Sequence, residues 1–395
     1  MGSSSDTVSL EQLDALVQPL ASHTTTIILF DLTSATANIP EPATPATPTT
    51  PAVTDPVALA RDAAALIRAN VTKLSLLIIN EPFSPSAIAP LLGSSALLRP
   101  LLALLAAVQS CDPEAYTLPF RQDLAHRAHR LLSELAGFLA KIPADGKALT
   151  GAQRDGGFSS GSGSGSGSGS AADRGSIPAT ALVWSACDAV AAVADLGVAG
   201  FLAHRLSDSK DTLDDIMQEL KEWSEQDPDD DNDDDDDDFD DDADSSDELD
   251  QGDAMQRMLD DLMAQKAIPA DDPDGIRPRL AATLRKLRMV VLLYQAVIKR
   301  RIKKLPPLPW PRGDTHPDIA QQLDRAVTVL GRLPDAFGDL AAAFYEMRAP
   351  AIDEAMAQCF EDAASASELL AKNWTGVADE FTQWTEKFQS ELRKT

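Results

Sequence analysis

Apolar side chains recur every three or four residues through most of the chain, which is the spacing of one face of an α-helix. Between Pro56 and Asn80 this stripe consists of Leu59, Ala63, Leu66, Ile67, Val71, Leu74 and Ile78. Asp55 followed by Pro56 is typical of a helix start. No segment alternates apolar and polar residues as a β-strand does. The pattern therefore predicts an all-α protein.

Capping residues and prolines set the boundaries of the predicted helices. A capping-box pattern from Ser9 to Gln12 opens the first helix, and the prolines that follow Leu305 stop a long one. The predicted helices span about residues 9–39, 56–80, 86–110, 120–141, 179–204, 211–225, 254–266, 278–305, 317–333, 335–347, 351–373 and 374–393.

Three stretches lack this spacing and separate the helices. Pro40 to Pro56 holds six prolines, Gly161 to Ser170 alternates glycine and serine, and Asp227 to Asp253 carries 18 carboxylates without a basic residue. Such compositions bury too little apolar surface to fold. We therefore predict two helical bundles, residues 1–226 and 254–395, joined by a disordered acidic linker at 227–253. Disordered insertions are expected within the first bundle at about 40–54 and 144–176.

The net charge, the apolar segments and the cysteines each argue against one kind of function or site. The formal net charge is −28, so direct nucleic-acid binding is not expected. The apolar window at 87–108 predicts buried helices and no membrane span, because it is interrupted by Pro90, Gly93, Arg99 and Pro100. No disulfide or zinc site is expected, because no CxxC pair occurs among the three cysteines Cys111, Cys187 and Cys359.

The candidate catalytic and metal-binding side chains are better explained as ordinary surface or core residues. Asp123, His126 and His129 have the spacing of a possible metal site, but they lie off the apolar stripe among arginines and indicate a solvated helix face. Cys187 lies in an Ala- and Val-rich helix, where a buried thiol behaves as a small hydrophobic group. No nucleotide-binding or hydrolase motif occurs. We expect no catalytic, cofactor-binding or metal-binding residues, and hence no enzyme.

The helix predicted from Arg277 to Lys304 carries ten basic residues and no acidic one. Its apolar face, which includes Leu280, Leu287 and Tyr294, is that of an ordinary bundle helix. Two interpretations stay open: a core helix with a solvated basic rim, or a rim that also contacts an acidic partner or a phosphate surface. The candidate interaction residues are Arg285, Lys286, Arg288, Lys299, Arg300, Arg301, Lys303 and Lys304.

The acidic linker and the Thr-Pro stretch each have two interpretations as well. The linker is either a solubilising spacer or an electrostatic binding segment, and its proximity in sequence predicts a weak, salt-sensitive contact with the basic rim. The Thr-Pro stretch is either a plain spacer or a phosphorylated segment. The candidate phosphorylation sites are Thr44, Thr47, Thr50 and Ser245.

An ordered set of segments carries a family resemblance. Val183-Trp184-Ser185-Ala186-Cys187 begins a helix, and an acidic helix follows with Asp214, Asp215, Glu219 and Glu222. After the acidic linker come Leu284 to Val290, then Ala336 to Leu340, and finally Ala351 to Leu370. In this order and spacing the chain resembles the cyclin-D-interacting protein family.

The resemblance implies a two-part helical protein of the cytoplasm and nucleus that needs no cofactor. It implies binding to cyclin-type or helix-loop-helix partners, and restraint of the cell cycle or of transcription. An alternative from another class is a helical scaffold or cytoskeletal adaptor of the vinculin or talin kind, whose long helices act as a mechanical spacer.

Overall fold

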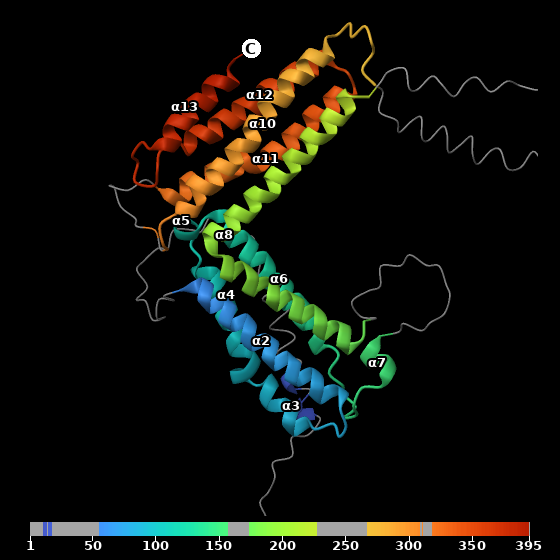
Figure 1. Cartoon of the computed structure of the whole chain (residues 1–395). Coiled ribbons are helices and arrows are strands. Elements are labelled where there is room, and N and C mark those ends of the chain that lie inside the picture. The colour runs from blue at the N-terminus through green and yellow to red at the C-terminus, as the bar shows by residue number, and fades with distance from the viewer. Residues whose placement is uncertain are drawn as a thin grey trace, which may run out of the picture. The chain divides into compact units, whose positions relative to one another are not determined.

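The computed structural model describes residues 11–13, 15–17, 55–156, 174–226, 267–308, 310 and 318–394. Within these ranges the regular elements are helices and no strand is present, which confirms the all-α prediction (Figure 1). The predicted linkers at 40–54 and 227–253, the predicted helix at 254–266 and residues 157–173 of the second insertion lie outside the described residues. So do the phosphorylation candidates Thr44, Thr47, Thr50 and Ser245.

The chain divides into two compact helical units. The first unit contains residues 1–201 with 308–310, and the second contains residues 202–307 with 311–395. The division falls inside a helix, after Phe201, whereas the domain boundary expected from the sequence follows that helix at residue 226.

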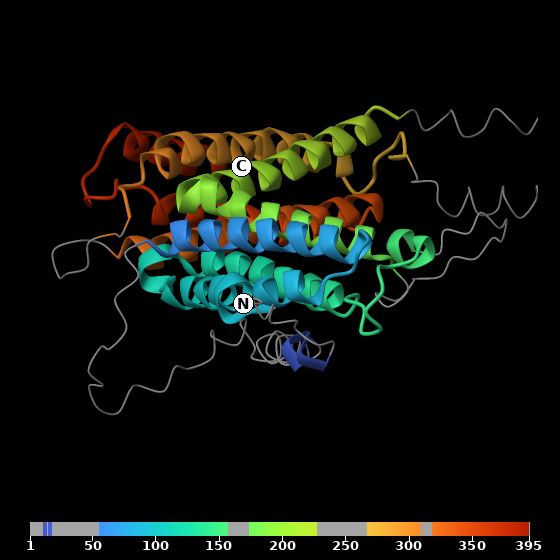
Figure 2. The same cartoon turned by 90° about the horizontal axis from the view of Figure 1, so that it is seen from below.

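The first unit is built from long helices that lie side by side in Figures 1 and 2. Its elements are α2 (Pro56–Ile79), α3 (Pro85–Leu92), the π-helical turn η2 (Ser94–Leu98), α4 (Arg99–Ser110), α5 (Pro113–Tyr116), α6 (Leu118–Leu139), α7 (Gly151–Asp155) and the first part of α8 (Ser176–Ser224). Residues 11–13 and 15–17 are also helical.

α2 shows why these segments fold as predicted. The Asp55 carboxylate accepts hydrogen bonds from the amides of Val57 and Ala58, and Pro56 occupies the first turn. The buried face of the helix is made of small and aliphatic side chains, which are Ala60, Ala63, Ala64, Ile67, Val71, Leu74 and Ile78. α2 packs chiefly against α4. This part of the core is therefore built from small and aliphatic side chains.

α8 corrects one predicted boundary. The sequence predicts two helices, 179–204 and 211–225, but the structure keeps residues 205–210 helical. His204 pairs with Asp208 and Lys210 pairs with Asp214, each one turn apart, which supports the helix there. The interruption lies instead at Gly197, where φ is 60° and ψ is −176°. That conformation is essentially restricted to glycine, because a Cβ atom would clash with the backbone.

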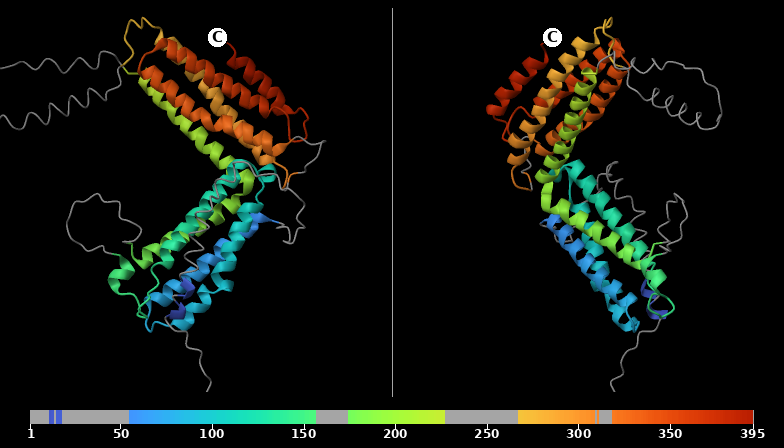
Figure 3. Two further views of the ribbon diagram at one scale, coloured as in Figure 1. Left: turned by 180° about the vertical axis from the view of Figure 1, so that it is seen from behind. Right: turned by 45° about the vertical axis from the view of Figure 1, so that its right-hand side comes forward.

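The second unit packs the end of α8 with four further helices, which lie side by side in Figure 3. These are α10 (Ile276–Arg300), with the short 3-10 turn η5 (Ile302–Lys304), α11 (Ile319–Tyr345), α12 (Ala349–Leu369) and α13 (Glu380–Leu392). The Trp223 ring of α8 meets Phe344 and Tyr345 of α11 edge to face. The predicted helix 374–393 begins later, at Glu380, because the preceding residues form a loop.

α11 corrects a second boundary. Pro334 was expected to separate helices 317–333 and 335–347, yet the helix continues through it. Proline has no N–H, so the carbonyl of Leu330, one turn earlier, lacks its usual helical donor. The buried hydroxyl of Tyr294 on α10 donates to this carbonyl. The missing backbone hydrogen bond is therefore replaced by a side chain from a neighbouring helix.

Candidate interaction surfaces

The structure sorts the predicted basic rim of α10 into three environments, of which the first is the protein interior. Arg301 is 1% exposed. Its guanidinium donates two hydrogen bonds of 2.8 Å to the Asp379 carboxylate and others to the carbonyls of Leu370 and Ala371. It also lies over the Phe381 ring, 4.4 Å from the centroid. The prediction that Arg301 belongs to an exposed rim is therefore wrong.

Arg301 instead holds three segments of the second unit together. Asp379 caps α13 by accepting hydrogen bonds from the amides of Phe381 and Thr382. The hydrogen bonds from Arg301, aided by those amides, lower the pKa of Asp379 from 3.8 to about 2. The end of α10, the loop after α12 and the start of α13 are thus joined through the buried Arg301 guanidinium.

The second environment is contact with neighbouring helices at the surface. Arg300 forms a 2.9 Å ion pair with Glu380. The Lys286 amine lies 5.4 Å from the centroid of the Phe360 ring, beside a cavity of about 280 Å³ that Met356 also lines. These two candidates are already engaged within the fold, although both remain partly accessible.

The third environment is open solvent. Arg285, Arg288, Lys299, Lys303 and Lys304 are exposed, and none of them forms an ion pair with the residues that the structure describes. The first three share one side of α10 with Leu292, whose side chain is 47% exposed. We call these five basic residues, of which Lys303 and Lys304 lie in η5 just after the helix, the unpaired cations of α10. They are the part of the predicted rim that stays available to a partner.

A cavity of about 410 Å³ lies beside the end of α10. Arg300, Arg301 and Lys304 supply its cationic side, and Pro306, Ile319 and Trp374 supply apolar walls. The Trp374 indole donates a 3.0 Å hydrogen bond to the carbonyl of Arg301. The remaining lining residues are Asn373, Thr375 and Asp379. We call this the α10-end cavity. Sequence reasoning missed it because its walls come from three distant segments.

In the first unit, α2 and α8 run antiparallel and are linked by polar contacts, which we call the α2–α8 seam. The deepest link joins the buried hydroxyls of Ser75 and Thr180 at 2.9 Å. The remaining links, in order along both helices, are Thr72 with the Trp184 indole at 3.0 Å, Arg68 with Asp188, and Arg61 with Asp195 at 3.4 Å. The links pass from the buried to the exposed side of the bundle, so the seam reaches the surface.

Trp184 is the most distinctive group of the seam. Its ring is half-buried, its N–H is held by Thr72, and the Arg68 guanidinium lies 5.7 Å from its centroid. Tryptophan and arginine held in this way are the residue types enriched at the energetic centres of protein interfaces. Small exposed residues lie within about two turns of Trp184 or Arg68 on the same helices, namely Ala65 and Ala69 on α2 and Ala181, Ser185 and Ala192 on α8.

Cys187 lies beneath this surface, one turn after Trp184. Burial raises the pKa of its thiol to about 12, so the sulfur stays protonated at neutral pH and fills space. Cys111 and Cys359 are also buried and free, and burial raises the pKa of each to about 12.

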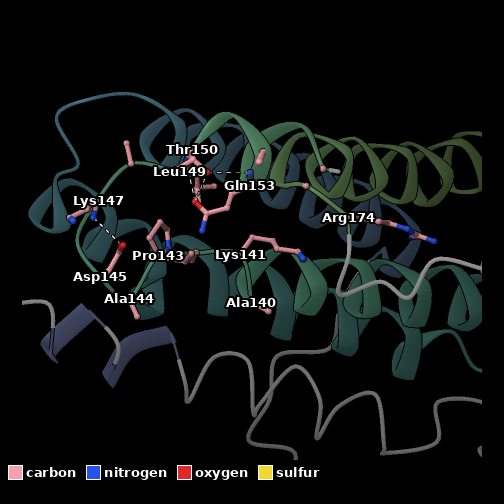
Figure 4. Close-up of a pocket in the computed structure, with 15 residues that line it drawn as sticks. Ala140, Lys141, Pro143, Ala144, Asp145, Lys147, Leu149, Thr150, Gln153 and Arg174 are labelled. Atoms are coloured by element: carbon pink, nitrogen blue, oxygen red, sulfur yellow. Dashed lines mark hydrogen bonds between the residues drawn. The ribbon is translucent and has the colours of Figure 1, made fainter. Parts of the chain in front are cut away.

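The largest cavity among those described, about 640 Å³, lies in the first unit between the end of α6 and the start of α8 (Figure 4). Its polar groups are engaged in shaping the loop. The Asp145 carboxylate accepts from the Lys147 amide, and Thr150 and Gln153 form a capping box. In Figure 4 the Arg174 side chain points away from the other labelled residues. The cavity therefore brings no set of titratable groups together.

The helix face with Asp123, His126 and His129 is likewise occupied by ordinary contacts. Asp123 pairs with Arg127 one turn later, and Arg127 also donates to the carbonyl of Ala189. Among the described residues, no three His, Cys, Asp or Glu side chains gather as metal ligands would.

Two stretches, Pro85–Ser110 and Ser176–Ser224, are long and apolar enough to cross a membrane by length and composition. This criterion is weak, because core helices of a bundle also satisfy it. In the structure Ile88, Leu104, Val183 and Val190 from these stretches are buried within the first unit.

Comparison with known families identifies the segment that contains the seam. The family model described as "Grap2 and cyclin-D-interacting, N-terminal" matches residues 60–226, from the first turns of α2 to just past the end of α8. This confirms the resemblance inferred from Val183 to Cys187 and the acidic helix after it. No curated protein and no solved structure matches the chain.

Proposed function

We propose that this chain, whose residues 60–226 match the Grap2 and cyclin-D-interacting family model, is a non-enzymatic protein that binds cyclin-type partners and restrains them. The family match is the observation that carries this proposal, because it covers both helices of the α2–α8 seam. Binding to helix-loop-helix proteins, restraint of the cell cycle and transcription, and presence in both cytoplasm and nucleus belong to the same proposal. These finer parts are supported by the family resemblance.

The seam is the surface to which we assign this binding. Trp184 supplies a large ring with few rotatable bonds, and the Arg68 guanidinium, which is paired with Asp188, lies over this ring. The neighbouring alanines let a partner helix approach closely, since their side chains end at Cβ. A helix laid along two antiparallel helices is a common mode of recognition, and its affinity comes from apolar anchors.

The test uses substitutions that obstruct the seam without disturbing the core. Ala181→Arg and Ala192→Arg place a long side chain at exposed positions of α8, next to Trp184 and Asp188. Ala281→Arg makes the same change at an exposed position of α10 in the second unit. Binding of the purified full chain to an immobilised D-type cyclin is measured by biolayer interferometry, and folding of each variant is checked by circular dichroism.

We expect each seam variant to bind at least tenfold more weakly than the parent, and Ala281→Arg to bind as the parent does. Equal binding by all three variants would assign the partner to another surface. If the parent bound filamentous actin but no D-type cyclin, the scaffold alternative would replace this proposal.

A further inference from the structure

The α10-end cavity combines an apolar interior with an uncompensated positive edge. Arg300 and Arg301 are neutralised by Glu380 and Asp379. Lys299, Lys303 and Lys304 have no such partner among the described residues. The other lining groups that face the cavity are the neutral Asn373 and Thr375. One unpaired positive charge, that of Lys304, therefore lines a cavity whose walls include an indole ring. The exposed Lys299 and Lys303 lie beside the lining residues in the sequence and add two more.

This combination specifies the chemistry of the occupant. The volume of about 410 Å³ is within the roughly 300–1,000 Å³ range of ligand-binding cavities, so one aromatic side chain fits with part of its backbone. The lysines favour carboxylates on either side of that ring. The expected ligand is an extended acidic segment that carries a single apolar side chain.

The chain itself contains such a segment. Residues 233–242 are nine aspartates with one phenylalanine, Phe239, which has six aspartates before it and three after it. A segment that served only as a charged spacer would gain nothing from this ring, because a lone exposed phenylalanine is unfavourable in water. The sequence of 233–242 thus complements both the apolar wall and the cationic edge of the cavity.

The connection is long enough for the two to meet. Phe239 is 13 residues beyond Gln226, which lets it reach at most about 45 Å from that point. The end of α8 and the start of α10 lie at the same end of the second unit (Figures 1 and 3). The cavity is at the other end of α10, whose 25 residues span about 37 Å. A nearly extended chain therefore reaches the cavity, and 27 residues remain before Ala267 for the return.

We propose that the α10-end cavity binds the acidic segment 233–242 of the same chain, with the Phe239 ring in the apolar part and the aspartates against Lys299, Lys303 and Lys304. The association is salt-sensitive, because exposed charges are screened beyond about 8 Å at physiological ionic strength. It goes beyond the proposed cyclin binding and concerns a different unit, so either proposal can fail without the other.

The first experiment measures the segment as a separate peptide. A fluorescently labelled peptide of residues 229–244 is titrated with the full chain and with a full-length variant in which those residues are replaced by an equally long Gly-Ser stretch. Anisotropy is recorded at low and physiological salt. We expect the Gly-Ser variant to bind the peptide at least tenfold more tightly than the parent, because the parent's own segment competes for the cavity.

Matched variants distinguish the contribution of the Phe239 ring to binding from that of the aspartates. They also distinguish binding at the cavity from binding elsewhere on α10. The peptide with Phe239→Ala should bind the Gly-Ser variant at least fivefold more weakly. Adding K303E and K304E to that variant should abolish binding, whereas the equal charge change R285E with R288E should have a smaller effect, since those residues lie three turns or more away. These exposed substitutions leave the buried Arg301 contacts intact.

The second experiment observes the segment within the full chain. Phe239 is replaced by 4-fluorophenylalanine, and its ¹⁹F signal is compared with that of the K303E, K304E form. We expect a shifted, broadened line that reverts to the free-peptide position in the charge-reversed form and does not change on dilution.

Three results would overturn the proposal. Equal affinity of the Phe239→Ala peptide would mean association by charge alone. Equal peptide binding by the parent and the Gly-Ser variant would mean that the cavity is open to acidic segments of other proteins. A ¹⁹F line that reverts on dilution would mean that the segment binds a second copy of the chain.

Discussion

The hydrogen bond from Tyr294 to the Leu330 carbonyl should be what allows α11 to pass through Pro334. Tyr294→Phe removes only the hydroxyl, so the ring still fills its site while the carbonyl of Leu330 loses its donor. A buried acceptor left without a partner costs about 1–3 kcal/mol. We therefore expect the second unit of the Tyr294→Phe variant to be destabilised by about that amount.

The assay is urea unfolding of the full chain, followed by tryptophan fluorescence. Three of the five tryptophans, Trp223, Trp374 and Trp384, report on the second unit. Burial raises the pKa of Tyr294 above its ordinary value, so the hydroxyl stays protonated and able to donate at neutral and mildly alkaline pH. Tyr116→Phe serves as the control, because that hydroxyl forms no hydrogen bond with the described residues and lies in the first unit.

A double-mutant cycle tests the reasoning directly. Pro334→Ala restores an N–H one turn after Leu330, which can bond to the same carbonyl. The cost of Tyr294→Phe should then fall by at least about 1 kcal/mol in the Pro334→Ala background. If Tyr294→Phe costs the same whether residue 334 is proline or alanine, the hydroxyl does not compensate for the proline, and this explanation of the unbroken helix is wrong.

Two further predictions concern stability. The pKa of Asp379 is about 2 in the folded chain, below the ordinary 3.8, so the pair with Arg301 stabilises fully above pH 3.8 and is lost as pH falls through about 2. Denaturation from pH 6 to 2 should therefore show a shrinking difference in the free energy of unfolding between the parent and Asp379→Asn. The decrease should be at most about 2 kcal/mol, because Asp379 is 32% exposed and solvent weakens the ion pair. A pH-independent difference would contradict this. Gly197→Ala should destabilise the chain by about 1–3 kcal/mol in thermal unfolding, because φ is positive there, whereas Gly137→Ala in the regular α6 should not.

The helices could be predicted from sequence because their signals are local. The stripe of α2 and the capping of Asp55 lie within a few residues of one another, and the structure contains that helix where it was expected. The continuity of α11 was also visible, since Leu330, Leu333, Phe337, Leu340 and Phe344 keep their helical spacing across Pro334. The proline and the periodicity predict different structures at residue 334, and the hydroxyl that compensates for the proline comes from another helix.

The contacts that form these surfaces could not be predicted from local sequence patterns, because they join residues that are far apart in the chain. Arg68 and Asp188 are 120 residues apart, and Arg301 and Asp379 are 78 residues apart. In the run from Lys299 to Lys304 every basic residue looks alike, because charge does not indicate orientation. α10 ends at Arg300, and the changed backbone at Arg301, with φ of −119° and ψ of −62°, belongs to the turn where its side chain becomes buried.

The pairing of charges in the second unit indicates that the unpaired cations of α10 are available to bind acidic groups outside the bundle. The chain carries 62 acidic side chains against 34 basic ones, so carboxylates are plentiful. The fold nevertheless supplies them to Arg279, Arg300 and Arg301 and leaves five other cations of the same segment without a described partner. Arg279 and Arg301 link α10 to α12 and to the start of α13, where a carboxylate fixes helix packing.

The unpaired cations face solvent, where pairing adds little stability. Their attraction is therefore available to acidic segments outside the bundle. The aspartates tethered to the same unit have the highest local concentration of any such ligand, so an acidic partner must compete with them, and salt weakens both contacts together.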